Sequence, residues 1–425
     1  MEREPLGVQL SPRCRKKHSG AGVHWDFQVM TTPAHSALYL SVPFCRTKCS
    51  FCNFASGVFS RQQFDGYVAH LELAMAGAES WVRANGGEFS PLLDSIYLGG
   101  GTPSVLAPDQ LERLFQSAAR SFKVKPGAEI TVEVAPGTLS PEILDVLVRC
   151  GVNRVSLGVQ SFVDEESRAV GRLHTRATTL DDIARLRAAG ITEISVDLIA
   201  GLPHQSLESW SRSLDGVIAL GVPHASVYML EVDDDSRLGR ELIAGGTRYH
   251  AHHVPDEALT VELYREACRR LNAAGLEQYE ISNFARAGHR SHHNLRYWQR
   301  LPYMGFGVDA HSMLPAPIQG EPHRAIRLAW PETIESLLAN TAAERTVVGE
   351  RQAIEETYFL GLRTVEGLEL VAIKEEFGIA AVDVYKERIT ELVARGLVEI
   401  DDGFLRLTAE GRLFSNDVFA EFLSE

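Results

Sequence analysis

Short apolar runs recur along the first half of the chain, and a longer amphipathic segment follows each of them. The runs are rich in β-branched and aromatic residues, as buried strands are. They span residues 37–42, 94–99, 129–134, 153–159, 193–199 and 225–230. Six strand–helix units in this order predict a parallel sheet with right-handed crossovers, curved into a partial barrel.

The segments between the runs repeat their apolar residues with the period of a helix. In residues 108–122, Leu111, Leu114, Phe115 and Ala118 fall on one face. Several of these segments end in glycine, as helices commonly do. Polar and glycine-rich residues follow the strands directly, at the rim where barrels of this kind carry their chemistry.

The pattern predicts four parts of the chain. Residues 1–36 are expected to be a poorly ordered extension without a secretory signal, and a translation start at Met30 is an equal alternative. Residues 37–240 form the partial barrel. Residues 241–345, rich in His, Arg and aromatic side chains, are expected to be an additional α+β segment covering the barrel mouth. Residues 346–425 end in a hairpin around "DDG", the outline of a winged-helix-like module.

Charge limits the possible partners of this chain. The 425 residues have a net charge of −14, and residues 350–425 contain 8 basic and 17 acidic side chains. Phosphate backbones attract the opposite sign, so no nucleic-acid role is expected and the last module is expected to be structural or to contact protein. The sequence contains no run of eighteen apolar residues, so no transmembrane segment is predicted. We therefore expect a cytoplasmic protein whose membrane association, if any, is peripheral and through partners.

Three of the six cysteines are crowded into "SVPFCRTKCSFCNF", at Cys45, Cys49 and Cys52. A structural zinc site would take four ligands, and ferredoxins supply four cysteines per cluster. Three thiolates on a 4Fe–4S cluster leave one iron open, as a catalytic centre requires. The spacing therefore predicts a 4Fe–4S cluster that binds a further ligand. Cys150 and Cys268 lie outside this motif.

The pattern Cys-x3-Cys-x2-Cys, with Phe51 before the last cysteine, resembles the signature of radical S-adenosylmethionine (radical SAM) proteins. A closer resemblance covers residues 37–425 and involves the heme chaperone (HemW) family, whose sister branch is the oxygen-independent coproporphyrinogen III oxidases (HemN). The motifs that carry it are "YLSVPFC", "YLGGGTPS", "RVSLGVQSF", "GRLH", "DLIAGLP", "YEISNFA", "HNLRYW" and "GFGVDAHS".

The resemblance implies a set of S-adenosylmethionine contacts. Gly100 and Gly101, with Thr102, would hold the amino-acid end of the ligand; the run lacks the Gly-Lys-Ser/Thr ending of a nucleotide P-loop. Glu133 is suited to accept from an ammonium or hydroxyl group. The remaining contacts are expected from Tyr39, Phe51, Gln160 and Arg172, and from Asp197 on the ribose.

Phe54 separates the two branches of this resemblance. The oxidases have a further cysteine at this position, whereas the chaperone branch has an aromatic residue, as in "CNF". By this resemblance we expect the cluster and the S-adenosylmethionine site without porphyrinogen decarboxylation.

The motif "HHNLRYW" carries the expectation of heme binding. Histidine nitrogen is a common axial donor to heme iron, and Tyr297 and Trp298 offer flat apolar faces. The resemblance favours His293 as the ligand, with His292 the competing candidate and His311 expected to be structural. Two departures from the family pattern are His204, where glycine is usual, and Asp309, where a small residue is usual.

Two functions follow as hypotheses, and no catalytic residue is assigned. The first is a carrier that binds heme and delivers it to heme-requiring proteins, with membrane respiratory enzymes as the expected recipients. The alternative is an oxygen-independent coproporphyrinogen III oxidase of porphyrin biosynthesis. A radical enzyme acting on an unrelated substrate is a third reading, which no residue specifically supports.

Overall fold

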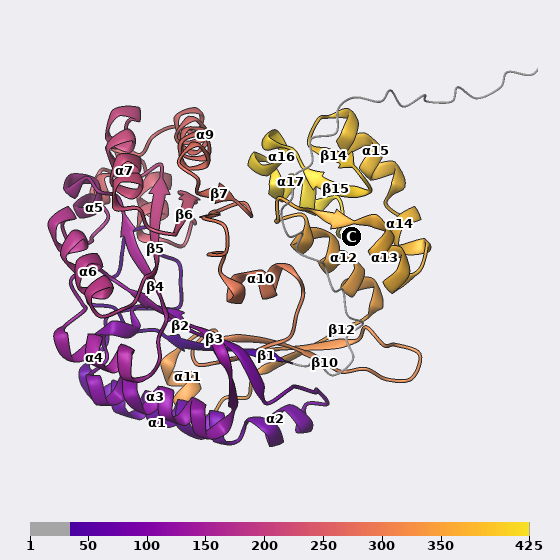
Figure 1. Ribbon diagram of the computed structural model, residues 1–425, viewed down its shortest axis with the longest axis horizontal. Coiled ribbons are helices and arrows are strands. Elements are labelled where there is room, and N and C mark those ends of the chain that lie inside the picture. Colours follow the sequence, from indigo (N-terminus) through magenta and orange to yellow (C-terminus); the bar gives the residue numbers. More distant parts are fainter. Residues whose placement is uncertain (1–34, 425) are drawn as a thin grey trace, which may run out of the picture.

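The computed structural model describes residues 35–424, and within them twelve strands form one large sheet (Figure 1). Its central strands are mutually parallel and lie in chain order, as the sequence predicts. They are β1 (Ser36–Val42), β2 (Leu92–Gly100), β3 (Lys123–Val134), β4 (Arg154–Gln160), β5 (Glu193–Ala200) and β6 (His224–Met229). The expected partial barrel is confirmed. The expected extension lies outside the described residues except at its end, where Ser36 already belongs to β1.

Helices cover the outer face of this sheet and enclose the main core (Figure 1). They are α1 (Arg61–Ala76), α2 (Ala78–Ala84), α3 (Pro108–Ser121), α4 (Pro141–Arg149), α5 (Asp164–Ala169), α6 (Arg176–Ala188) and α7 (Leu207–Leu220), with a short 3-10 turn, η1 (Pro103–Val105), after β2. On β1, Leu38, Leu40 and Val42 are buried in this core. Because successive side chains of a strand alternate in direction, Tyr39 and Ser41 point to the inner face.

The segment after β6 extends the sheet at both edges. On one side β9 (Tyr303–Phe306) pairs in parallel with β1, and β10 (His311–Pro315), β11 (Ala325–Ala329) and β12 (Glu344–Val348) continue antiparallel. On the other side β8 (Asn283–Ala285) pairs with β6, and β7 (Glu277–Gln278) pairs with β8. The helical elements of the segment are α8 (Arg237–Ile243), η2 (Arg248–His253), α9 (Glu257–Ala273), α10 (His292–Trp298) and α11 (Ile334–Leu338).

Helix α10 lies on the inner face of the sheet, near the amino-terminal ends of the strands, and not over the barrel mouth. Glu129 of β3 accepts hydrogen bonds from the backbone N–H groups of His292 and His293, at 3.0 and 2.9 Å. At the other end of the helix Arg296 forms a 2.6 Å ion pair with Asp94 of β2. The expectation that this segment covers the mouth is therefore wrong for α10, because acidic side chains near the strand starts hold the helix there.

The last part of the described chain has its own core and a three-stranded sheet, ordered β13-β15-β14. It contains α12 (Glu350–Gly361), β13 (Leu368–Glu369), α13 (Leu370–Phe377), α14 (Ala380–Asp383), α15 (Lys386–Ala394), β14 (Val398–Asp401), β15 (Phe404–Leu407), α16 (Ala409–Leu413) and α17 (Ser415–Ala420). Asp402 and Gly403 both have positive φ, at 48° and 83°, as a type I′ hairpin turn requires.

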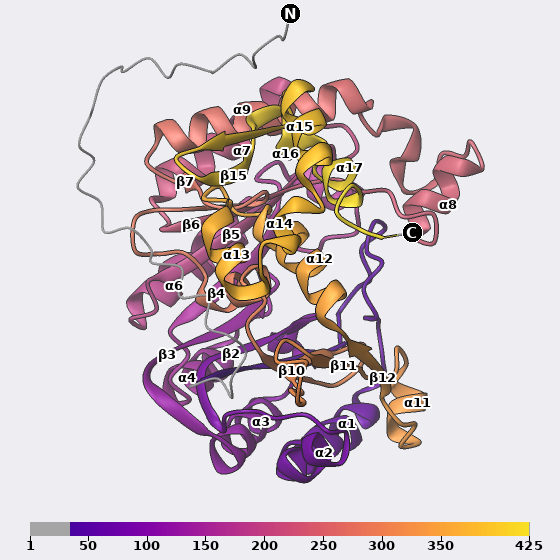
Figure 2. The same ribbon diagram turned by 90° about the vertical axis from the view of Figure 1, so that its right-hand side faces the viewer.

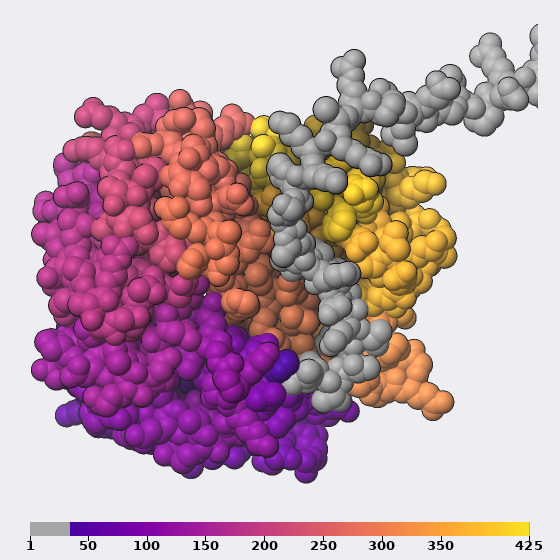
Figure 3. Space-filling model, in the orientation of Figure 1, coloured from indigo at the N-terminus to yellow at the C-terminus, as the bar shows by residue number. Residues whose placement is uncertain are grey.

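This C-terminal module packs against the segment that precedes it (Figures 2 and 3). Arg300 donates to Glu356 of α12 at 2.8 Å, and both side chains are buried. The backbone of Val365 also donates to Tyr279 at 3.0 Å. Within residues 35–424, none of the helices combines the length and apolar character needed to cross a membrane.

Candidate functional site

The three clustered cysteines lie in a loop, residues 43–57, that follows β1 and closes on itself. The backbone of Cys45 donates to Gly57 at 2.8 Å, and Gly57 donates back to Pro43 at 2.8 Å. Inside the loop the Lys48 ammonium donates to the carbonyls of Phe54 and Ser56, at 2.8 and 2.7 Å. These bonds hold the cysteine loop at the carboxyl end of β1, where the sequence predicts the chemistry.

Each cysteine sulfur has a polar neighbour. The Thr102 hydroxyl donates to the Cys45 sulfur at 3.7 Å, Arg172 donates to Cys49 at 3.7 Å, and the Ser56 hydroxyl lies 3.8 Å from Cys52. Burial raises the pKa of the Cys45 thiol, and its bonds from Thr102 and Ser56 oppose that shift. Donors of this kind stabilise the thiolate form, which is the form that ligates a metal.

The donor set of the cysteine loop fits one kind of centre. Three cysteine thiolates can each ligate a different iron of a 4Fe–4S cluster. Beside the loop, the buried Nε of Arg172 and Oγ of Ser50 have no hydrogen-bond partner among the described residues. The donor set and these unpartnered groups fit a cluster with a polar ligand beside it.

The glycine run at the end of β2 packs against the protein itself. A Cβ added at Gly101 would lie 2.6 Å from the carbonyl oxygen of Val42, and one added at Gly99 would lie 2.8 Å from the Glu133 carboxyl. Gly100 has φ of 93°, a conformation that favours glycine. These glycines are therefore needed for contact with β1 and β3, in addition to the close approach of a ligand expected from the sequence.

Glu133 lies on the inner face at the end of β3. Its carboxylate accepts from the Tyr97 hydroxyl at 2.8 Å and from the Gly100 N–H at 3.1 Å. Burial raises the pKa of Glu133 to about 7; the Tyr97 bond counteracts this shift and the nearby Asp197 adds to it. The ring of Tyr39 stands 6.1 Å from that of Tyr97. Tyr39, Gly100 and Glu133 are thus brought together around Tyr97.

Arg172 connects the cysteine loop to β4. Besides Cys49, its guanidinium donates to the carbonyl of Gly158. A Cβ added at Gly158 would lie 3.0 Å from a side-chain nitrogen of Gln160 and 3.0 Å from one of Arg172. The side chains of these two predicted ligand contacts therefore both lie beside Gly158. Gln160 has φ of 67°, which is uncommon for a residue with a side chain and recurs at functional sites.

Asp197 is held by three serines, one on its own strand β5 and one on each of the neighbouring strands β4 and β6. Its carboxylate accepts from Ser156 at 2.8 Å, from Ser226 at 2.8 Å and from Ser195 at 3.2 Å. Burial raises the pKa of Asp197, and the three serine bonds oppose the shift. In the parallel register Asp197 stands opposite Gly158, so it lies one strand from the position of Arg172 and Gln160.

Phe51 and Phe54, both in the cysteine loop, have different surroundings. Phe51 packs against a small apolar cluster of Val170, Ile199 and Leu202. Phe54 is exposed over 64% of its surface. An exposed aromatic ring therefore stands two residues after the last cysteine, where the oxidase pattern would place a further thiol.

His293 lies deeper in the barrel, below Tyr97. Its ring stacks on Tyr97 with centroids 5.1 Å apart, and its Nδ1 and Nε2 are bonded to Ser95 and Tyr297, at 3.0 and 2.9 Å. Only 1% of the residue is exposed, and burial lowers its pKa to about 3, so the imidazole is neutral. His292, the competing candidate, is exposed.

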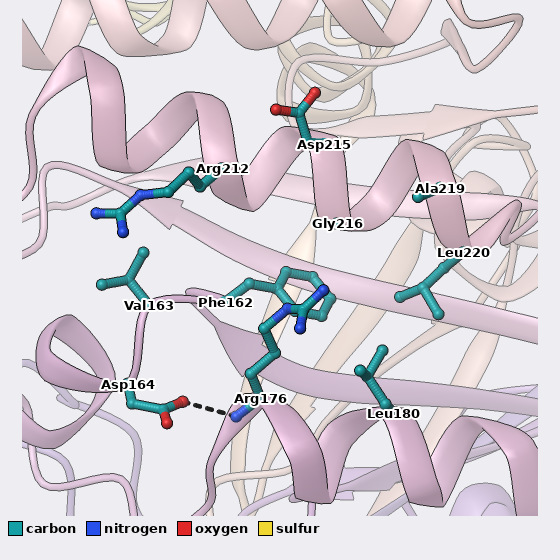
Figure 4. A pocket seen from close by; sticks show the side chains of 10 residues that line it. All are labelled: Phe162, Val163, Asp164, Arg176, Leu180, Arg212, Asp215, Gly216, Ala219 and Leu220. Atoms are coloured by element: carbon teal, nitrogen blue, oxygen red, sulfur yellow. Dashed lines mark hydrogen bonds between the residues drawn. The ribbon is translucent and has the colours of Figure 1, made fainter.

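A separate pocket of about 590 Å³ opens between α6 and α7 (Figure 4). Phe162 forms its floor, and the Asp164 carboxylate accepts from the backbone of Arg176 at 2.7 Å. It lies in the outer helical layer and contains none of the residues predicted for the site. The candidate site is therefore the inner face and mouth of the barrel.

Several polar residues of this inner face were not singled out in the sequence. Tyr97 anchors Glu133, and Ser156, Ser195 and Ser226 anchor Asp197. Their signal is the alternation of polar and apolar residues within strands that also read as continuous apolar runs. Glu129 and Ser95, which hold α10 and His293, carry the same signal.

Known proteins resemble the chain over nearly its whole length. The radical SAM superfamily matches residues 39–215, and the HemN C-terminal domain matches residues 349–414. The chain is 33% identical over 391 residues to "Heme chaperone HemW" of Bacillus subtilis, a match covering 91% of this chain and 99% of that protein. The chain belongs to the HemW family. The HemW protein of Lactococcus lactis is also 33% identical, over 91% of this chain and 97% of its own length.

A solved structure supports the fold of this HemW-family chain. The coproporphyrinogen III oxidase HemN of Escherichia coli, a radical SAM enzyme, superposes with a TM-score of 0.77 over 93% of this chain and 91% of its own. At 23% identity this likeness establishes the shared architecture. Radical SAM membership implies a 4Fe–4S cluster and S-adenosylmethionine, which the donor set of the cysteine loop fits.

Proposed function

We propose that this protein is a heme carrier: it binds heme and passes it to heme-requiring proteins, respiratory enzymes among them. The observation that carries the proposal is Phe54, an exposed aromatic residue beside an otherwise complete cysteine motif. The chain also matches proteins named heme chaperones over nearly their full length. We place it in the cytoplasm, with any membrane contact made through recipients.

The proposed cofactor site uses residues from several strand ends. Cys45, Cys49 and Cys52 would ligate the 4Fe–4S cluster, which supplies an open iron for S-adenosylmethionine and an electron for its cleavage. The unpartnered Nε of Arg172 is suited to a carboxylate of that ligand.

The other contacts proposed for S-adenosylmethionine line the same face of the sheet. Glu133 and Asp197 would accept hydrogen bonds from ligand amino or hydroxyl groups, once the Tyr97 and serine bonds around them adjust. Thr102, which already donates to the Cys45 sulfur, would help to hold the amino-acid end of the ligand. The remaining proposed contacts are Tyr39, Phe51, Gly100, Gly101 and Gln160.

The assignment of His293 as the axial ligand of the heme remains a prediction. Its two ring nitrogens are already bonded, so ligation through Nε2 would replace the Tyr297 hydroxyl. Opening of α10 away from the sheet would therefore accompany ligation. His292 needs no such opening, because it is exposed at the first position of the same helix.

Titration of the cluster-loaded protein with hemin tests the carrier proposal. We expect saturable uptake with the absorption spectrum of imidazole-ligated heme. His293→Ala and His292→Ala, made separately, identify the ligand on α10 by partial or complete loss of that spectrum, and His311→Ala is the matched histidine control. A wild-type protein that takes up no hemin would refute the carrier proposal.

The alternative function is oxidation of coproporphyrinogen III. The structural likeness to the Escherichia coli oxidase favours it at the level of fold, and Phe54 opposes it. Formation of the decarboxylated product by this protein would establish the alternative.

A further inference from the structure

Four histidines from two distant parts of the sequence meet at the carboxyl end of β5. His204 lies in the loop after β5, and His250, His252 and His253 lie in η2. The Nε2 of His204 is 2.9 Å from the Nδ1 of His250. The ring centroids of His204 and His253 are 4.1 Å apart, and those of His252 and His253 are 4.0 Å apart. We call these four residues the histidine cluster.

The backbone holds this cluster in place. His204 donates its N–H to the carbonyl of His253 at 2.9 Å, which ties the loop to η2. His204, Tyr249 and His250 have φ of 69°, 55° and 58°, in the left-handed region that residues with side chains seldom adopt. Such conformations persist where the surroundings determine them, and they concentrate at ligand sites. The histidine at position 204, a departure from the family pattern, therefore has a defined structural setting.

The histidine cluster lies beside the cysteine loop. Arg237 of α8 donates to the carbonyl of Lys48 in that loop, and its guanidinium stands 5.5 Å from the ring of Tyr249. The backbone of Leu238 also donates to Ser50 at 2.8 Å. Helix α8, with η2 packed on it, therefore connects the two features at the barrel mouth.

The cluster suits an iron porphyrin better than a bare ion. A protein-bound metal ion needs three or more converging side chains, and the described residues contain no such group of His, Cys, Asp or Glu. Heme iron already has four porphyrin nitrogens and needs only one or two axial imidazoles. His250, His252 and His253 are all exposed and can supply them.

The surroundings of the histidines also match the rest of a heme molecule. Arg240 of α8 and Arg248 of η2 are exposed cations, and propionate groups are anions that guanidinium binds well. Ile243, at the end of α8, is exposed over 69% of its surface and offers an apolar contact.

We propose that the histidine cluster is a surface heme site, distinct from His293, at which an exposed imidazole ligates the iron. The inference rests on the proposed carrier function and adds to it a place of exchange. An axial imidazole at the surface can be replaced by one from a recipient protein, whereas His293 is enclosed by Ser95, Tyr97 and Tyr297.

The test compares heme binding by the full-length, cluster-loaded protein and a variant lacking all four imidazoles. The variant carries His204→Gly, His250→Gly, His252→Ala and His253→Ala; glycine at 204 and 250 suits the left-handed backbone and keeps the fold. His311→Ala is the control, because this histidine is half-exposed but distant in the fold on β10. Circular dichroism and the iron content check that each protein is folded and loaded.

We expect the four-site variant to lose one equivalent of imidazole-ligated heme, or to bind it at least about tenfold more weakly, with His311→Ala unchanged. Unchanged stoichiometry, affinity and spectrum in the variant would overturn the surface site and leave the carrier function standing. Equal loss in His311→Ala would also overturn it, because the binding would then be nonspecific to exposed histidines. A wild-type protein that binds no heme would overturn the carrier function itself.

Discussion

Cys49 is the most enclosed of the three clustered thiols, 8% exposed and bonded by Arg172. We predict that Cys49→Ala abolishes assembly of the cluster, because two thiolates cannot replace three at separate irons. Iron and acid-labile sulfide content after anaerobic reconstitution measure the effect. Cys150→Ala is the control, since Cys150 lies at the end of α4 and away from the loop. Full iron and sulfide in Cys49→Ala would contradict the ligand assignment.

Glu133 makes stability depend on pH in the protein without S-adenosylmethionine. Burial raises the folded-state pKa from 4.5 to about 7, so ionisation of the carboxyl costs folding free energy as pH rises through that interval. Glu133→Gln removes the ionisation. Between about pH 5 and about pH 8 we expect wild type to lose on the order of 1–2 kcal/mol of stability relative to the variant, a figure reduced for the partial exposure of this side chain.

Denaturant unfolding of both proteins at the two pH values measures this difference. Glu262→Gln, an exposed change on α9, is the control and should follow wild type at both. If the difference in unfolding free energy between wild type and Glu133→Gln stays constant with pH, or changes in the opposite direction, this carboxyl is not the group responsible.

At the scale of elements, the contact between β1 and the end of β2 fixes the cysteine loop. Gly101→Ala would place a methyl group 2.6 Å from the Val42 carbonyl, so we expect a loss of about 1–3 kcal/mol as the backbones separate. Gly66→Ala in α1 meets nothing within 4 Å and should gain about 0.5–1 kcal/mol. Chemical denaturation compares the two. Equal stability in both variants would mean that this contact is not tight.

The sequence predicts some elements well and others poorly, for physical reasons. The six parallel strands bury an apolar outer face in the main core, so their apolar runs are evident in the sequence, and α3 shows a full apolar stripe. Helix α10 has seven residues and few apolar ones, and it is held by Glu129 and Asp94 from elsewhere in the chain. Such tertiary contacts cannot be predicted from a local sequence pattern, and neither can the pairing of β9 with β1.

The candidate site likewise contains some residues that the sequence predicts and others that it does not. The residues that follow strands could be predicted, because the carboxyl ends of parallel strands share one rim. Their partners could not: Tyr97 under Glu133, and the serines around Asp197, became evident only from the register of the strands. His293 was predicted as an available ligand, but its ring nitrogens are already bonded, one to Tyr297 on the same helix and the other to Ser95, nearly two hundred residues away.

At the scale of the whole molecule, one chain combines a barrel that implies radical chemistry with features proposed to carry heme. The acidic C-terminal module packs on the segment that bears α10, through Arg300 and Glu356.

The most direct test offers hemin and coproporphyrinogen III in parallel to the anaerobically reconstituted protein, with S-adenosylmethionine and a reductant present. A carrier should take up hemin stably and form no decarboxylated porphyrinogen, and this is the result we predict. Product formation would contradict the carrier assignment and would show that a cysteine at the position of Phe54 is dispensable for the oxidase reaction.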